Sequence, residues 1–150
     1  MKTTKKIMPT HYLTVLLIIS IILHLIIPIK KILYPSITYI GFLFIVIGII
    51  MNLWTDRLFN QKKTTVKPHL NPTVLITSGP FQLSRHPMYL GMLCLLLGVA
   101  FTLGTVSTFI PPMIFFIVMK MRFIPIEERN LTKVFGDEYL SYKQKVRQWV

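Results

Sequence analysis

The chain has 150 residues, which is enough for a single domain. Hydrophobic residues make up 53% of it and charged residues only 15%, whereas a soluble domain carries about 25% charged residues. This composition excludes an ordinary soluble domain and indicates a membrane protein. The net charge of +12 lies in patches between long uncharged stretches. Such patches fit the anionic surface of a bilayer better than a nucleic acid, so no nucleic-acid partner is expected.

Two uncharged stretches predict the first two membrane spans, because a helix needs about 20 apolar residues to cross the hydrocarbon. The first span is expected at about residues 11–28. The lysines before it also fit a signal peptide, but the length of the run and the lack of a small-residue cleavage site favour a retained helix. The second span is expected at about 34–54, where Gly41 and Gly48 share one face and favour close packing against another helix.

A hairpin of two further spans is predicted after a loop over residues 55–86. Residues 86–119 contain no Asp, Glu, Lys or Arg. A single helix of that length would measure about 51 Å, whereas the hydrocarbon is only about 30 Å thick. We therefore expect two spans, at about 87–104 and 107–124, with a reversal near Gly104.

The remaining residues predict an amphipathic helix at about 127–149, because apolar side chains recur there at spacings of three and four. Gly136 and Asp137 are expected to divide it, with the glycine as a C-cap and the aspartate as an N-cap. The predicted fold is thus an all-α integral membrane domain over residues 1–150, with about four spans.

The distribution of basic residues predicts the orientation. In a four-span arrangement, only Lys30 and Lys31 of the 17 Lys and Arg residues lie on the side opposite the termini. The positive-inside rule then places both termini, the 55–86 loop and the C-terminal helix in the cytosol.

Two clusters at the cytosolic mouth could carry chemistry. The first surrounds His86, where Pro87 restricts the histidine to an extended conformation and begins a helix. It could equally be an interfacial Arg-His anchor. The second is Glu127-Glu128, which could be an ordinary helix N-terminus or a counter-charge for a cationic ligand such as S-adenosylmethionine.

Other titratable groups have simpler interpretations. His24 lies within the first span, where a neutral histidine packed between helices is favoured over a functional group. Cys94 lies in an apolar run and is interpreted as a small buried hydrophobe. No histidine or cysteine cluster suggests a metal site.

Four motifs resemble one family when they are taken together and in order. They occupy residues 75–79, 85–91, 127–131 and 135–142. In sequence and spacing they are similar to the isoprenylcysteine carboxyl methyltransferases, which are related to the phospholipid N-methyltransferases. The resemblance implies a cytosolic pocket for S-adenosylmethionine and a lipophilic or lipidated substrate that enters sideways from the bilayer. It implies cofactor contacts at Thr73, Val74, Leu75, Ile76, Phe81, His86, Pro87, Met88, Tyr89 and Glu127.

The chain departs from the family pattern at one position. Four residues before the first glutamate the family usually has an arginine that holds the substrate carboxylate, and Phe123 stands there in this chain. The neighbouring Arg122 is the candidate to orient a carboxylate instead. For an amine acceptor, Glu128 or His86 is the candidate proton acceptor.

Three alternatives remain from the sequence. The acceptor could be the amine of a phospholipid or another lipid. A membrane reductase of the sterol type would share similar helices but would bind a nicotinamide cofactor. A non-enzymatic membrane protein on the same scaffold would bind neither cofactor.

Overall fold

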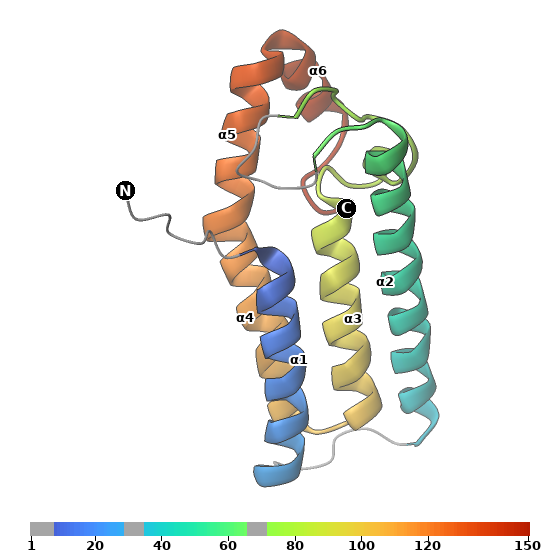
Figure 1. Cartoon of the computed structure of the whole chain (residues 1–150). Helices are drawn as coiled ribbons and strands as arrows, with labels where there is room; N and C mark the ends of the chain where they lie inside the picture. The colour runs from blue at the N-terminus through green and yellow to red at the C-terminus, as the bar shows by residue number, and fades with distance from the viewer. Residues whose placement is uncertain (1–7, 29–34, 66–71) are drawn as a thin grey trace.

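The computed structural model describes residues 8–28, 35–65 and 72–150, and in these residues it contains helices but no strand. Figure 1 shows the helices as one elongated bundle. The helical segments, in chain order, are α1 (Pro9–Ile26), α2 (Pro35–Gln61), η1 (Gly79–Gln82), α3 (Pro87–Leu103), η2 (Val106–Phe109), α4 (Ile110–Val118), η3 (Met119–Phe123), α5 (Ile124–Phe135) and α6 (Asp137–Lys145). The segments η1 and η2 are 3-10 helices, and η3 is a π-helix that joins α4 to α5.

Three helical runs are long and apolar enough to cross a membrane. They are Pro9–Ile26, Thr38–Gln61 and the continuous run Val106–Phe135, while Pro87–Leu103 is apolar but shorter. These lengths make the chain an integral membrane protein. The run Val106–Phe135 would measure about 45 Å, which is longer than the hydrocarbon thickness of about 30 Å.

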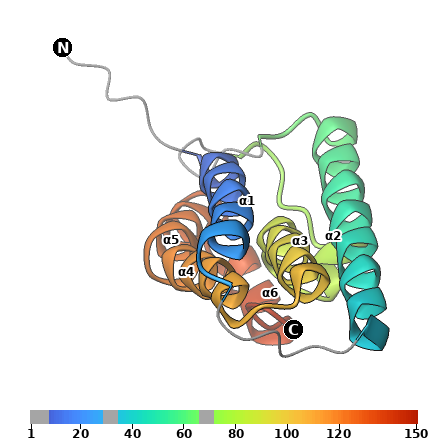
Figure 2. The ribbon, with the colours of Figure 1, turned by 90° about the horizontal axis from the view of Figure 1, so that it is seen from below.

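The four long segments alternate in direction along the bundle. α1 and α4 lie together, and α3 lies between them and α2 (Figure 2). The end of α2, the start of α3, and helices α5 and α6 gather at one end, which we call the polar end (Figure 1). The opposite end carries the turn between α3 and α4. The two clusters around His86 and Glu127-Glu128 therefore both lie at the polar end.

Helices α2 and α3 pack through glycines. A Cβ atom added at Gly48 would lie 2.6 Å from the carbonyl oxygen of Gly91, and one added at Gly41 would lie 2.6 Å from the carbonyl oxygen of Gly98. No larger side chain fits between backbones this close. The close packing predicted at Gly41 and Gly48 is confirmed.

The reversal predicted near Gly104 is also confirmed. Gly104 ends α3 with φ +71°, a left-handed conformation that favours glycine. The buried Thr108 side chain donates a hydrogen bond to the carbonyl oxygen of Thr105 at 2.6 Å. Nearby, His24 Nδ1 and Thr105 Oγ1 lie 3.4 Å apart, so this histidine links α1 to the turn.

The second span and the following loop differ from the sequence prediction. Helix α2 continues to Gln61, so residues 55–61 of the predicted loop are helical. No glycine or proline interrupts this segment, and Leu58 and Phe59 pack against buried aromatic residues at the polar end. Tertiary packing thus extends the helix beyond the apolar run. Residues 29–34, which include Lys30 and Lys31, and residues 66–71 lie outside the described residues.

The C-terminal helix expected at about 127–149 is divided near Gly136, as predicted, but its outer bounds differ from the prediction. Helix α5 begins at Ile124 and follows α4 directly through the π turn. Gly136 ends α5 with φ +50°, as predicted, but Asp137 is the first residue of α6 and makes no capping hydrogen bond. Helix α6 ends at Lys145, because the next residues form an extended segment that contacts the loop before α3.

Candidate active site

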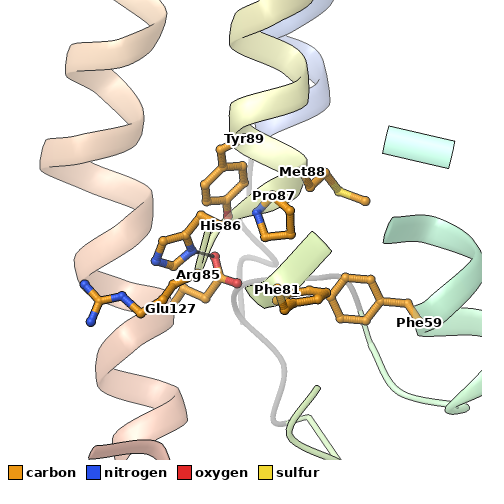
Figure 3. Close-up of a pocket in the computed structure, with 8 residues that line it drawn as sticks. All are labelled: Phe59, Phe81, Arg85, His86, Pro87, Met88, Tyr89 and Glu127. Atoms are coloured by element: carbon orange, nitrogen blue, oxygen red, sulfur yellow. Dashed lines mark ion pairs between the residues drawn. The ribbon is translucent and has the colours of Figure 1, made fainter. Parts of the chain in front are cut away.

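A polar pocket lies where α2, η1, α3 and α5 meet at the polar end. Its empty space is about 260 Å³, including the side open to solvent. Figure 3 shows the lining side chains, with the His86 and Glu127 groups directed toward one another. The lining residues are Phe59, Phe81, Arg85, His86, Pro87, Met88, Tyr89 and Glu127.

The loop before α3 holds His86 in place. The backbone N–H of His86 donates to Ser84 Oγ at 3.2 Å, and its carbonyl oxygen accepts the first helical hydrogen bond from Leu90 at 3.0 Å. The φ of −127° is extended, but the ψ of 60° lies outside the extended range that Pro87 was expected to impose. These two hydrogen bonds explain the difference, because they make His86 the N-cap of α3. The ring stacks on Tyr89 at a centroid distance of 5.6 Å.

Glu128 is the centre of a charge network. Its carboxylate lies 3.0 Å from Arg85 Nη2, 3.4 Å from His86 Nε2 and 2.8 Å from Lys143 Nζ. Burial alone would raise the pKa of Glu128, but hydrogen bonds from His86 and Lys143 and the charge of Arg85 lower the pKa to about 2. Glu128 is therefore ionised at neutral pH and joins α5 to both α6 and the loop before α3.

Glu127 and His86 face the pocket with unsatisfied polar atoms. The Nδ1 atom of His86 lies 3.5 Å from Oε2 of Glu127, which is too long for a good hydrogen bond. Both atoms are buried, and neither has a hydrogen-bond partner among the described residues. Nε of Arg85 is buried without a partner as well. The pocket thus offers one carboxylate oxygen and one guanidinium N–H to a ligand.

The C-terminal residues hydrogen-bond to the loop before α3 and to η1. The backbone N–H of Arg85 donates to the carbonyl oxygen of Arg147 at 3.1 Å. The hydroxyl of Ser84 donates to the carbonyl oxygen of Gln148, also at 3.1 Å. The hydroxyl of Tyr142 donates to the carbonyl oxygen of Phe81 at 2.6 Å and so fixes η1. The C-terminal segment is therefore part of the wall that supports the pocket.

Six of the ten predicted cofactor contacts line this pocket, and four do not. The six are Phe81, His86, Pro87, Met88, Tyr89 and Glu127. Thr73 and Val74 are exposed, whereas Leu75 and Ile76 pack into the aromatic cluster under η1 and α6. The apolar side chains of Leu75 and Ile76 are used for packing, so they do not reach the pocket.

The two predicted catalytic residues lie outside the pocket lining. Glu128 lies behind His86 in the charge network. Arg122 is exposed on η3, and Phe123 beside it is buried with its ring against Tyr12 at 5.6 Å. Sequence reasoning missed two lining residues. Arg85 stands within a quoted motif, whereas Phe59 follows the second apolar run with no local signal.

The charge state of His86 predicts a pH-dependent stability. Burial alone lowers the pKa of His86, but the carboxylates of Glu127 and Glu128 outweigh burial and raise the pKa from 6.5 to about 9. The folded chain therefore binds this proton more tightly than the unfolded chain. The stabilisation is complete below about pH 6.5 and is lost as the pH rises through 9. The thermal unfolding midpoint should fall across this interval in the wild type and stay nearly level in His86→Gln. A level wild-type profile would contradict the assignment.

The fold and the pocket define a helical integral membrane protein with a carboxylate-bearing polar site at one end of the bundle. Residues 37–138 match the model of the family described as Phospholipid methyltransferase. This match covers more than half of the chain, and the chain belongs to that family.

Several relatives carry a more specific name. The chain is 37% identical over 81 residues to the protein-S-isoprenylcysteine O-methyltransferase of Schizosaccharomyces pombe, covering 53% of this chain and 32% of that protein. It is 32% identical over 116 residues to a probable protein of the same name from Oryza sativa subsp. indica, covering 75% of this chain and 60% of that one. An uncharacterized protein of Haemophilus influenzae is 43% identical over 63 residues, which are 42% of this chain and all of that protein.

The fold has a solved counterpart. The eukaryotic intramembrane Ras methyltransferase, an isoprenylcysteine carboxyl methyltransferase, superposes with a TM-score of 0.73 at 21% identity, over 100% of this chain and 53% of that one. These matches confirm the resemblance that the four motifs indicated. The chain spans about a third to three fifths of the length of the named methyltransferases that it matches.

Proposed function

We propose that this chain binds S-adenosylmethionine in the polar pocket and transfers its methyl group to a lipophilic acceptor held in the membrane. The observation that carries the proposal is the buried carboxylate oxygen of Glu127, which faces the pocket and has only a long contact of 3.5 Å to His86 Nδ1. A buried carboxylate oxygen without a well-formed hydrogen bond is costly unless a ligand supplies a closer donor. A cationic ligand is the natural complement.

The polar atoms of the pocket fit the amino-acid part of that cofactor. Oε2 of Glu127 can accept from an ammonium group, and the free Nε of Arg85 can donate to a carboxylate. The aromatic rings of Phe81 and Tyr89 in the lining offer faces to a purine or a sulfonium. The enclosed space of this pocket is about 20 Å³, far below the range of about 300–1,000 Å³ of ligand pockets, so the lining side chains must move apart for a nucleoside to enter.

The chain's own residues would bind and orient the cofactor and exclude water from it. When bound, S-adenosylmethionine supplies an electrophilic methyl group on a sulfonium that departs as a neutral thioether. Glu127 would bind the cofactor, and Arg85 would orient it. Glu128 would act as a positioning residue, because it holds Arg85 and His86 in place. Burial of the loop before α3 would exclude water from the transfer.

The protonation states favour a carboxylate acceptor over an amine. An amine must lose a proton, and neither neighbouring group is prepared to take one. The pKa of Glu128 is lowered to about 2 and that of His86 is raised to about 9, so at neutral pH Glu128 is a weak base and His86 already carries a proton. A carboxylate needs no base. We therefore propose an isoprenylated carboxyl acceptor, as the relatives' names suggest, with the lipid amine as the second candidate.

Cofactor titrations test this function directly. Purified protein should bind S-adenosylmethionine in calorimetry and should transfer labelled methyl groups into a membrane lipid extract. A nicotinamide cofactor should bind far more weakly, because its phosphates would meet the carboxylate of Glu127. Preferential nicotinamide binding would instead support a reductase, and binding of neither cofactor would support a non-enzymatic protein.

We also propose that α1, α2, α3 and the run from η2 to η3 all cross the bilayer, with the polar end and both termini in the cytosol. The basic residues of the described α5 and α6 support this orientation. Reporter fusions after residue 150 and within residues 60–65 should both report cytosol. A report of the opposite side from either fusion would overturn the arrangement.

A further inference from the structure

An apolar groove runs between α3 and α4 on the surface that the bilayer surrounds. Its empty space is about 840 Å³, including the open side, and every lining residue is apolar. The wall includes Leu93 and Leu97 on α3, and Met113, Phe116 and Ile117 on α4. Met113 is 64% exposed, so the groove opens outward rather than into the bundle core.

The end of this groove nearest the polar end carries two polar groups. The ring of Trp149 lies 4.9 Å from the ring of Phe116, and Nζ of Lys120 lies 5.7 Å from the centroid of the same ring. Nε1 of Trp149 is buried and has no hydrogen-bond partner among the described residues. A buried indole N–H usually finds an acceptor, so this one can serve a ligand.

The same tryptophan is tied to the polar pocket. Gln148, the residue before it, accepts the hydrogen bond from Ser84, two residues before His86. Trp149 also packs against the buried cluster that contains Tyr89, which lines the pocket. The mouth of the groove and the pocket therefore share one wall.

We propose that Lys120 and the indole N–H of Trp149 hold the anionic head group of the methyl acceptor, while its hydrocarbon tail lies in the groove. The groove is apolar over its length, whereas its mouth combines a positive charge with a free donor. A single-tailed lipid with a carboxylate head complements both parts. This inference rests on the proposed function and names the residues that select its acceptor.

Arg122 is the competing anchor. It is exposed on η3, as Lys120 is, but it lines neither the groove nor the polar pocket. Lys120 differs because its ammonium lies over Phe116 at the groove mouth. The two cations can be separated by single substitutions.

The test measures the affinity for a defined probe in the absence of cofactor. The probe is an N-acetylated S-isoprenyl cysteine, and its S-methyl counterpart lacks the tail. Trp149→Phe keeps the ring and removes the N–H, Lys120→Gln removes the charge, and Met113→Trp fills the groove. The first two variants should each weaken probe binding by about 3- to 10-fold, and the third by at least about tenfold. Lys133→Gln, an exposed basic residue elsewhere on α5, is the control.

Affinity for S-adenosylmethionine is measured on the same samples and should be unchanged in Lys120→Gln, Met113→Trp and Lys133→Gln. If the wild type fails to bind that cofactor, the proposed function is contradicted. The probe titrations still show whether the groove, Lys120 and Trp149 bind the probe. The inference is overturned if folded variants bind the probe as the wild type does. It is also overturned if Arg122→Gln alone weakens binding, if the tail-less probe binds equally well, or if anionic phospholipid vesicles displace the probe at equal concentration.

Discussion

Replacement of Glu128 by leucine is expected to destabilise the contact between α5 and the loop before α3 at the polar end. The carboxylate is 12% exposed and the Arg85 side chain only 8%, so the substitution would leave a buried guanidinium without its ion-pair partner, beside a protonated His86. Breaking a buried ion pair in this way costs about 3–5 kcal/mol. Amide exchange at Arg85, whose N–H donates to the carbonyl oxygen of Arg147, should therefore accelerate by about two to four orders of magnitude.

The matched control removes the exposed partner of the same carboxylate. The side chain of Lys143 is 43% exposed, and an exposed ion pair contributes about 0–1 kcal/mol. Lys143→Met should therefore change the exchange rate little. The double variant Arg85→Met/Glu128→Leu should recover part of the lost protection. If Glu128→Leu were no more disruptive than Lys143→Met, the network would not be what holds α5 to the loop.

Glu127→Gln is expected to weaken cofactor binding while the protein stays folded. The amide keeps the shape of the side chain and removes the charge. A hydrogen bond to a charged group contributes about 1.5–3 kcal/mol, so the affinity for S-adenosylmethionine should fall by roughly 10- to 150-fold. Calorimetry measures this directly.

The control for this substitution is Glu138→Gln. Glu138 is an exposed carboxylate in the first turn of α6, away from the pocket lining. It undergoes the same chemical change and should leave the affinity unchanged. Equal affinities in Glu127→Gln and the wild type, with both folded, would remove Glu127 from the cofactor site.

Much of the backbone could be predicted from local sequence. The apolar runs predicted the order of the long helices, because the length of a run and the thickness of hydrocarbon are both known. Gly104 and Gly136 marked a reversal and a break, and both adopt positive φ. Gly41 and Gly48 indicated a packing face before their partner helix was known. These features depend on neighbours close in the chain.

The motifs also predicted much of the pocket. His86, Pro87, Met88 and Tyr89 lie together because they are consecutive. The predicted topology placed Glu127 at the same end of the bundle, and the family resemblance assigned both to one cofactor pocket. Spacing alone could not have paired the two, since they lie on separate helices. The family pattern thus supplied a long-range contact that composition and periodicity do not contain.

What only the tertiary structure decided is how the charges are paired. Glu127 and Glu128 are adjacent and chemically identical, yet Glu127 faces the pocket with one long contact to His86, whereas Glu128 binds Arg85, His86 and Lys143. Successive residues on a helix point about 100° apart, so their surroundings are set by the elements packed on each side. Phe59, buried Phe123 and the contact of Trp149 with Phe116 likewise depend on residues far away in the chain. Local pattern determined the helices of this protein, and long-range packing determined which of its charged groups remain available to a ligand.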